Sequence, residues 1–489
     1  MPRPAHAGAE ALPPDHWVYE ELEHFEARGL LHLHGCRPYS RSEVRLWVET
    51  LAARADSGEA VLGRVEIQRL RRLADEFVRG GDLEDAGRRF DPPLLRGGEA
   101  GWAFAGDADL RAGGAGRDGG AGDAWGTAHL ETVLDFRSWI AYETRYRLSL
   151  DSDAEELPGR PLSSRQRNWR GLVSENDRAY VAAERGPLRL RLGRDFTAWG
   201  PRRGQELLVS ASGQSLDALE LQVHLRRFRL TSVTALLSGG RGRRYAAHRL
   251  EADLGPLHLG VQEAVVYASS SFEPAYLFPI SFYYGNQFNE RADDNVLVGA
   301  DLKWVSRLGV LQGELLVDDA IYDGDPAPQK LGFGLGLRRA VALGGTDLDL
   351  ALGYVRLNRW VYTHRQGTNY YVAGSGDPKR GDPFLGNALG PDADRLQAEM
   401  DWSPSGRWML WLQASRTRRG AGNLDLVDWQ RGTPYELPFP SGVVRHENHG
   451  EFGARARLSR STEMRAAAAF GSAPGGRQMR LQGELRLDL

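Results

Sequence analysis

The sequence has little cysteine, little lysine and no long apolar run. Cys36 is the only cysteine, which excludes a disulfide framework and a cysteine metal cluster. Almost all basic residues are arginine, since the lysines are Lys303, Lys330 and Lys379 alone. The formal net charge of -3 provides no overall positive field, which argues against nucleic acid as a partner.

No segment reaches the roughly 18 to 20 uncharged apolar residues that a membrane-spanning helix needs. The best candidate, Ala264 to Phe288, is interrupted by Glu273, Pro274 and Pro279. Only helices and closed barrels satisfy the backbone polar groups inside lipid, so a membrane protein of this composition would be a barrel. The 59 glycines and 24 prolines fit a chain rich in turns and strands.

Residues 125–489 show the strand pattern of a barrel. Apolar residues alternate with polar ones, as in the segment from Leu219 to Leu225, and tight turns such as Ser403 to Gly406 join neighbouring strands. Trp402 and Trp408 flank that turn, where an interfacial aromatic girdle would lie. Long polar connections follow at residues 193–217, 265–295, 358–394 and 416–449. The pattern predicts an all-β transmembrane barrel of roughly 16 to 18 antiparallel strands.

Residues 1–78 have a helical pattern and are expected to form a small periplasmic segment. Asp15 is predicted to cap a first helix that ends at Gly29, Ser40 and Glu43 form a capping box for a second, and a third spans residues 61–77. Residues 79–124 are expected to be a Gly-rich linker with a candidate first strand at residues 102–110. Residues 5–7 have the A-x-A form of a signal-peptidase site, so we expect that the start of a signal peptide is missing.

The N-terminal helices resemble an S-layer-homology module, which begins H-W-A-Y and continues through a Gly-containing loop to R-P-x-x-R-x-E. The matching residues are His16, Trp17, Tyr19, Gly29, Arg37, Pro38, Arg41 and Glu43. The loop from Leu30 is shorter than the family's, and there is one copy where several are usual. The resemblance implies binding to cell-wall glycan or peptidoglycan through Trp17, Arg37 and Arg41. The alternative is a structural helical pair at the periplasmic mouth of the barrel.

The barrel region is similar to the capsule-assembly Wzi family. The similarity rests on G-R-D-F-T-A-W-G-P-R-R-G-Q-E-L-L-V-S at residues 193–210, N-E-R-A-D-D-N-V-L-V-G-A-D-L-K-W at residues 289–304, and G-E-L-L-V-D-D at residues 313–319. It implies an outer-membrane barrel, surrounded by lipid, that binds capsular or related exopolysaccharide at the cell surface and helps to organise it. It implies no catalysis.

One loop gathers the parts of a sugar-binding site: Asp195, Trp199, Arg202 and Arg203. Aromatic faces stack on sugar rings, and arginine binds uronate carboxylates through two hydrogen bonds. The alternative is a loop folded into the lumen, with its charges paired internally. Tyr283 and Tyr284 belong to a dense aromatic cluster that either contacts saccharide or packs the loop against the barrel rim.

Two other functions are weighed against the lectin. The first is a porin tethered to the cell wall by its N-terminal segment, which would conduct small solutes. The second is an outer-membrane hydrolase using His224, His248 or His258, but no G-x-S-x-G or H-E-x-x-H motif accompanies them. We therefore expect no catalytic residue, no metal site and no cofactor.

Overall fold

The protein is described by a computed structural model of the 489-residue chain. It describes residues 8–488, apart from residues 81–82, 100, 118–122, 137–139, 152–155, 158–159, 162–171, 212–213, 238–241, 291–292, 320–327, 366, 375, 377–381, 426, 431, 433, 435–436 and 474–475. The predicted signal-peptidase motif at residues 5–7 lies outside the described residues.

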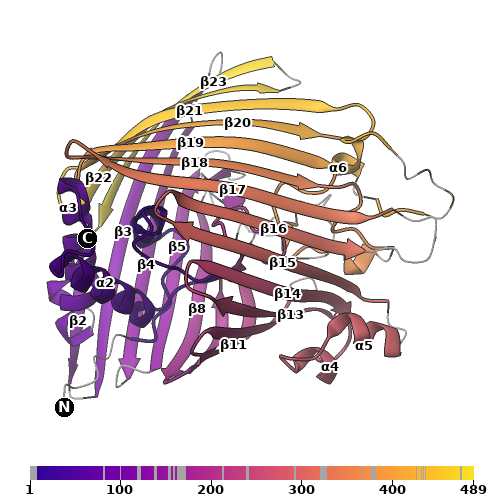
Figure 1. Cartoon of the computed structure of the whole chain (residues 1–489), viewed down its shortest axis with the longest axis horizontal. Coiled ribbons are helices and arrows are strands. Elements are labelled where there is room, and N and C mark those ends of the chain that lie inside the picture. The colour runs from indigo at the N-terminus through magenta and orange to yellow at the C-terminus, as the bar shows by residue number, and fades with distance from the viewer. Residues whose placement is uncertain are drawn as a thin grey trace.

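The described residues form a closed antiparallel barrel of 18 strands, which confirms the predicted fold and the upper end of the predicted strand number (Figure 1). It closes where β23 pairs with β3. The strands are β3 (Trp102–Arg117), β4 (Asp123–Phe136), β5 (Ile140–Asp151), β8 (Leu172–Arg185), β9 (Leu188–Asp195), β11 (Leu216–Leu225), β12 (Phe228–Leu236), β13 (Arg243–Asp253), β14 (Leu257–Ala268), β15 (Asn295–Ser306), β16 (Gly309–Asp319), β17 (Lys330–Leu343), β18 (Thr346–Leu357), β19 (Ala393–Ser405), β20 (Trp408–Arg419), β21 (Arg445–Arg457), β22 (Thr462–Ala473) and β23 (Gly476–Asp488).

The strands turn apolar side chains outward and polar ones inward. On β9, Leu188, Leu190 and Leu192 are exposed on the outer face, whereas Arg189 and Arg191 between them are buried in the interior. This is the reverse of a water-soluble barrel, and it is the pattern that lipid on the outside and polar groups in the lumen require. The predicted girdle residues Trp402 and Trp408 are likewise exposed, one on each side of a tight turn.

The barrel wall begins earlier in the chain than residue 125. Residues 95–99 form β2 (Leu95–Glu99), which pairs with the first residues of β3. β3 is longer than the candidate strand at residues 102–110, and it lies in the wall beside β4, with β23 paired to residues 109–117 on its other side. The glycines and alanines of β3 gave this segment the composition of a linker, but its backbone pairs continuously with β4.

Three helices precede the barrel: α1 (Val18–Ala27), α2 (Arg41–Asp56) and α3 (Arg64–Ala74), the last continuing into a π-helical turn, η1 (Asp75–Arg79). The capping box of Ser40 and Glu43 is present, and Gly29 ends α1 with a positive φ of 72°. The predicted cap at Asp15 is wrong, because α1 begins after Trp17 and the Asp15 carboxylate pairs with Arg145 in the barrel wall.

Figure 1 shows α2 and α3 at one end of the barrel and the short helices α4 (Pro274–Leu277), α5 (Tyr283–Glu290) and α6 (Ala421–Asp425) at the other. The end with α2 and α3 is the one at which tight turns join the strands: Gln68 accepts a hydrogen bond from the Gly406 amide in the turn between β19 and β20. We call it the short-turn end, and the other the long-loop end. Among the described residues, no helix is long and apolar enough to cross a membrane.

Candidate functional site

The inner wall of the barrel carries buried, paired charges. The Arg178 guanidinium on β8 is fully buried and donates to Asp195 across 2.7 Å, and it also pairs with Glu143 on β5. Arg249 on β13 pairs with Asp301 on β15 across 2.5 Å. Each pair links two strands on the inner face of the wall. A side chain that packs against this face must carry a complementary charge, because a buried charge without a partner is costly.

The N-terminal helices enter this network from the short-turn end. The Glu23 carboxylate on α1 lies 3.1 Å from Arg203 and 3.2 Å from Arg338 on β17. Burial raises the pKa of Glu23, but the two arginines outweigh it and bring the pKa to about 2. Arg455 on β21 donates to Glu20, one turn earlier on α1, across 2.8 Å. The helices therefore act as a plug whose charges complement the inner wall, and we call residues 8–79 the plug.

His24 is the centre of the closest contact between plug and wall. Its Nδ1 lies 2.9 Å from the Asp349 carboxylate on β18, and its Nε2 lies 3.2 Å from Glu66 on α3 and 3.8 Å from Asp347. Burial lowers the pKa of His24, but the charge of Asp349 and the hydrogen bonds that the ring donates to Asp349 and Glu66 outweigh it and raise the pKa to about 9. At neutral pH the ring is therefore a cation shared by two elements of the plug and one strand.

The same group has donors that could hold a metal ion, because the ligand atoms of His24, Glu66 and Asp347 lie within 4.8 Å of one another. Two arginines already occupy the carboxylates: Arg28 lies 3.0 Å from Glu66, and Arg69 lies 3.0 Å from Asp347. With a protonated histidine and two guanidinium groups on these oxygens, the arrangement is that of an ion-paired cluster.

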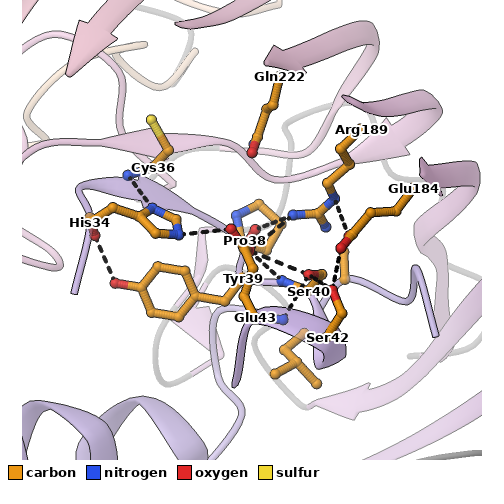
Figure 2. A network of polar contacts seen from close by, with 12 residues as sticks. His34, Cys36, Pro38, Tyr39, Ser40, Ser42, Glu43, Glu184, Arg189 and Gln222 are labelled. Atoms are coloured by element: carbon orange, nitrogen blue, oxygen red, sulfur yellow. Dashed lines mark hydrogen bonds and ion pairs between the residues drawn. The ribbon is translucent and has the colours of Figure 1, made fainter. Parts of the chain in front are cut away.

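A second contact joins the plug to β8, β9 and β12, and Figure 2 shows its part on β8 and β9. Glu43, at the start of α2, lies 3.0 Å from His34, 3.4 Å from Arg189 and 2.7 Å from Arg229 on β12. Ser42 donates to the Glu184 carboxylate on β8. One carboxylate of the plug thus has two wall arginines as partners, and this fixes the rotation of α2 against the barrel.

Residues 196–211, in the loop between β9 and β11, fold into the lumen. Its β10 (Ala198–Trp199) pairs with β1 (Cys36–Arg37) of the plug, and the Trp199 amide donates to Val209 across 2.9 Å. The loop joins the plug to the interior of the barrel, and it carries the four residues predicted as a sugar-binding set.

All four predicted residues lie inside the barrel. Asp195 pairs with Arg178 and Arg191, and Trp199 has no exposed surface. Arg202 lies 3.3 Å from Glu399 on β19, while Arg203 holds Glu23 of the plug. Their partners are protein groups, as in the alternative of a loop folded into the lumen.

The half of the lumen toward the long-loop end has a different filling, an apolar core. Leu207 and Leu208 of the inward loop pack with Tyr362 and Tyr371 of the loop at residues 358–392 and with inward side chains of the wall such as Leu316. Tyr371 donates to the Leu208 carbonyl across 2.8 Å. The two long loops therefore form one packed layer inside the barrel.

Arg243 of β13 fixes the second of these loops in place. Its guanidinium donates to four backbone carbonyls of the loop, those of Thr368, Tyr370, Val372 and Gly374, at 2.5 to 3.0 Å. A single side chain thus satisfies a row of backbone acceptors that turn toward the interior.

The predicted aromatic residues Tyr283 and Tyr284 lie at the rim of the long-loop end, on α5. Tyr283 is buried, and its hydroxyl donates a hydrogen bond to the Tyr276 carbonyl across 3.0 Å. The His248 ring packs against the Tyr283 ring. Tyr284 is half-buried beside it. Tyr283 therefore packs the loop onto the rim, and Tyr284 is the more accessible of the two.

The three residues predicted to bind cell-wall glycan, Trp17, Arg37 and Arg41, do not lie at one site. Arg37 is buried and donates to Glu206 of the inward loop across 2.7 Å. Arg41 lies 2.8 Å from Glu10 and 2.9 Å from Glu76 within the plug. Trp17 and Arg41 both line a cavity at the short-turn end, and Arg37 does not.

Three long loops meet on the outer side of the apolar core, a group that the sequence analysis did not identify. Asp293, Arg365 and Asp428 come from three different loops: Arg365 lies 2.5 Å from Asp293, and Asp428 accepts from Thr363 of the same loop as Arg365 across 2.9 Å. The Arg365 side chain is 73% exposed. We call these residues, with Trp429 beside them in the chain, the loop-face cluster. No sequence spacing connects them, because they meet only when the loops fold together.

Comparison with solved structures identifies the fold. The chain is similar to Wzi, an outer-membrane protein described as involved in group 1 capsule assembly in Escherichia coli and as a carbohydrate-binding β-barrel, with a TM-score of 0.64, 12% identity, 98% of this chain covered and 99% of that chain. Pseudomonas aeruginosa OccD3 (TM-score 0.44, 10% identity, 79% and 91% covered) and Acinetobacter baumannii OccAB4 (0.45, 10%, 79% and 98%) are more distant. No family model and no curated protein matches. The fold expected from the sequence resemblance is thus confirmed.

Proposed function

We propose that this protein is an outer-membrane barrel that binds and organises capsular or related exopolysaccharide at the cell surface, without catalysing a reaction. The observation that carries the proposal is the filling of the lumen from both ends, by a charged plug and by an apolar layer of loops. A lumen filled in this way favours a role for the loops themselves over passage of solutes. Wzi, whose fold this chain shares, is described as a carbohydrate-binding barrel.

The orientation follows from the lengths of the connections. Barrels of the bacterial outer membrane have short periplasmic turns and longer extracellular loops. The plug would then lie on the periplasmic side, as the sequence analysis expects, and the loop-face cluster would lie on the cell surface. The exposed leucines on the outer face would contact the lipid of the outer membrane.

The loop-face cluster is the part of that surface best suited to an acidic polysaccharide. Arg365 is exposed, and its ion pair with Asp293, the one that the described residues form with it, leaves guanidinium N–H groups for a ligand. Arginine binds a uronate carboxylate through two parallel hydrogen bonds. The half-buried Trp429, adjacent to Asp428, supplies an aromatic side chain in the same region.

The test measures binding of the full-length protein, in detergent or nanodiscs, to surface polysaccharide purified from the source bacterium. We expect saturable binding that Arg365→Ala weakens about tenfold, equivalent to about 1.4 kcal/mol. The matched control is Arg79→Ala, which removes an exposed arginine paired with one carboxylate at the opposite end. It should leave binding unchanged.

The same assay distinguishes the other predicted site. If Arg202→Ala/Arg203→Ala abolishes binding and Arg365→Ala does not, the site lies in the inward loop. If the wild-type protein does not bind the polysaccharide and conducts ions stably in a planar bilayer, the proposal is wrong and the tethered porin is supported.

A further inference from the structure

A cavity of about 550 Å³ lies between the plug and the inner wall at the short-turn end. Trp17 and Arg41 line it from the plug, Asp107 on β3 and Glu131 on β4 from the wall, and Asp488 from the end of β23. The volume is within the range of about 300 to 1,000 Å³ that small-molecule sites occupy. The plug's contacts with the wall, described above, leave this space unfilled.

Several charged groups of the cavity have a partner within the protein. Asp15 accepts two hydrogen bonds from Arg145 at 2.9 Å, and Asp109 lies 2.8 Å from Arg111 and 3.1 Å from His129. These groups of the cavity lining are therefore ion-paired within the protein, like the contacts between plug and wall described above.

Two wall carboxylates differ from these pairs. Within the described part of the chain, neither Asp107 nor Glu131 has a basic side chain within ion-pair distance, although both face the cavity. Asp91, between the plug and the first strand, has no basic side chain within ion-pair distance among the described residues, and burial together with Glu76 and Asp488 raises its pKa to about 8. Acidic groups therefore outnumber their cationic partners on this side of the cavity, and a bound cation would favour their ionised form.

Arg89 provides an independent observation. Its residue is 94% buried, and its Nε donates to the Gly80 carbonyl across 2.9 Å. Arg89 is one of the residues that line the same cavity, and its buried Nη2 has no hydrogen-bond acceptor among the described residues. A buried guanidinium N–H without an acceptor is costly, so a ligand that brings an acceptor to this point would be stabilised there.

The arrangement does not suit a single ion. Among the described residues, the one set of three carboxylate, histidine or cysteine ligands that converges within 4.8 Å is the His24 cluster, which lies elsewhere. The cavity's carboxylates are spread around it, so a ligand must reach them at several points. A hydroxyl group donates to a carboxylate and accepts from Arg89 at once, whereas an ammonium group complements the excess of carboxylates, eight against six arginines in the lining.

We propose that this cavity binds an amino sugar of one or two rings, with hydroxyl groups between Arg89 and the wall carboxylates and the amino group beside Asp107 and Glu131. The site is separate from the loop-face cluster and lies at the opposite end of the barrel. It therefore does not depend on the proposed binding of surface polysaccharide.

The test is calorimetric titration of the full-length protein in detergent with the β-1,4-linked disaccharide of glucosamine, and with its fully N-acetylated form as an uncharged comparison. We expect the amine form to bind, and the N-acetylated form to bind at least tenfold more weakly. Glu131→Gln and Asp107→Asn together should weaken binding of the amine form at least tenfold, since they remove the carboxyl groups that would form ion pairs with the amino group and keep the side-chain shape.

The matched control is Glu59→Gln, which removes one exposed carboxylate of the same N-terminal segment away from the cavity and should leave binding unchanged. Circular dichroism and the heat-dependent shift of the barrel on gels verify that each variant is folded. The proposal is wrong if the wild-type protein binds neither disaccharide, if both forms bind equally, or if the folded double variant binds as tightly as the wild type.

Discussion

The two halves of the lumen are filled by different chemistry. At the short-turn end, side chains such as Glu23, His24 and Glu43 of the plug meet arginines and carboxylates of the wall. Toward the long-loop end, Leu207 and Tyr362 pack against apolar side chains of the same strands. One barrel wall is therefore polar inside near the plug and apolar inside near the loops.

This difference has a physical consequence. Buried ion pairs contribute little net stability, because desolvation offsets their attraction, but they penalise every wrong arrangement. Apolar packing is tolerant of orientation and adds stability in proportion to the area buried. We infer that the charges position the plug in one orientation, whereas the apolar layer contributes most of the stability of the filled lumen.

The largest effect is expected from a charge at the polar end. Arg178→Ala leaves the buried Glu143 without its arginine and Asp195 with Arg191 alone, and it should lower the free energy of unfolding by about 3–5 kcal/mol. Denaturant unfolding of the barrel in detergent measures it. Arg194→Ala is the control, because Arg194 pairs with Asp217 on the exposed side, where loss of a pair costs at most about 1 kcal/mol. Equal losses for both variants would contradict the buried network.

Toward the long-loop end, the free energy of unfolding should depend on the volume of the buried side chains and should not depend on salt concentration. Leu316→Ala removes a fully buried side chain on β16 and should cost about 2–5 kcal/mol, and this loss should be the same at low and high salt. Leu316→Met, which nearly conserves volume, should cost less than about 1.5 kcal/mol. A comparable loss for both substitutions would mean that the layer is loosely packed, which would remove the contrast between the two ends.

The sequence predicted the wall better than its filling. Alternation along segments such as Leu219 to Leu225 specifies which face of a strand meets lipid, and the tight turns and long loops fix the order of the strands. The capping box at Ser40 and Glu43 was also readable, because it depends on residues three apart. These features are local, and local patterns are what a sequence displays directly.

The filling depends on contacts between distant segments. Arg203 and Glu23 are 180 positions apart, and nothing in either segment indicates that they meet. The set of Asp195, Trp199, Arg202 and Arg203 was predicted to be a sugar site because of its residue types. The same residue types form ion pairs and packing contacts with protein groups, so their presence in one loop does not identify the partner. Asp293 and Arg365 were missed for the same reason, since only the folded loops bring them together.

The smallest effect is expected from pH acting on the plug through His24. The groups around it are the carboxylates of Asp349, Glu66 and Asp347 and the guanidinium groups of Arg69 and Arg28. The pKa of His24 is about 9 in the folded protein and about 6.5 when unfolded, so its contribution is complete below pH 6.5 and is lost as the pH rises toward 9.

Unfolding free energies of the wild-type protein, measured between pH 6 and pH 9, should therefore fall by up to about 3 kcal/mol from this group. His24→Gln removes the titrating group and should flatten this part of the profile, and His32→Gln, a change at an exposed histidine of the plug, should preserve it. If His24→Gln leaves the alkaline decline intact, the imidazolium does not hold the plug to β18. The arginine pairs alone would then account for the charged half of the lumen, and the plug would be held independently of pH across this range.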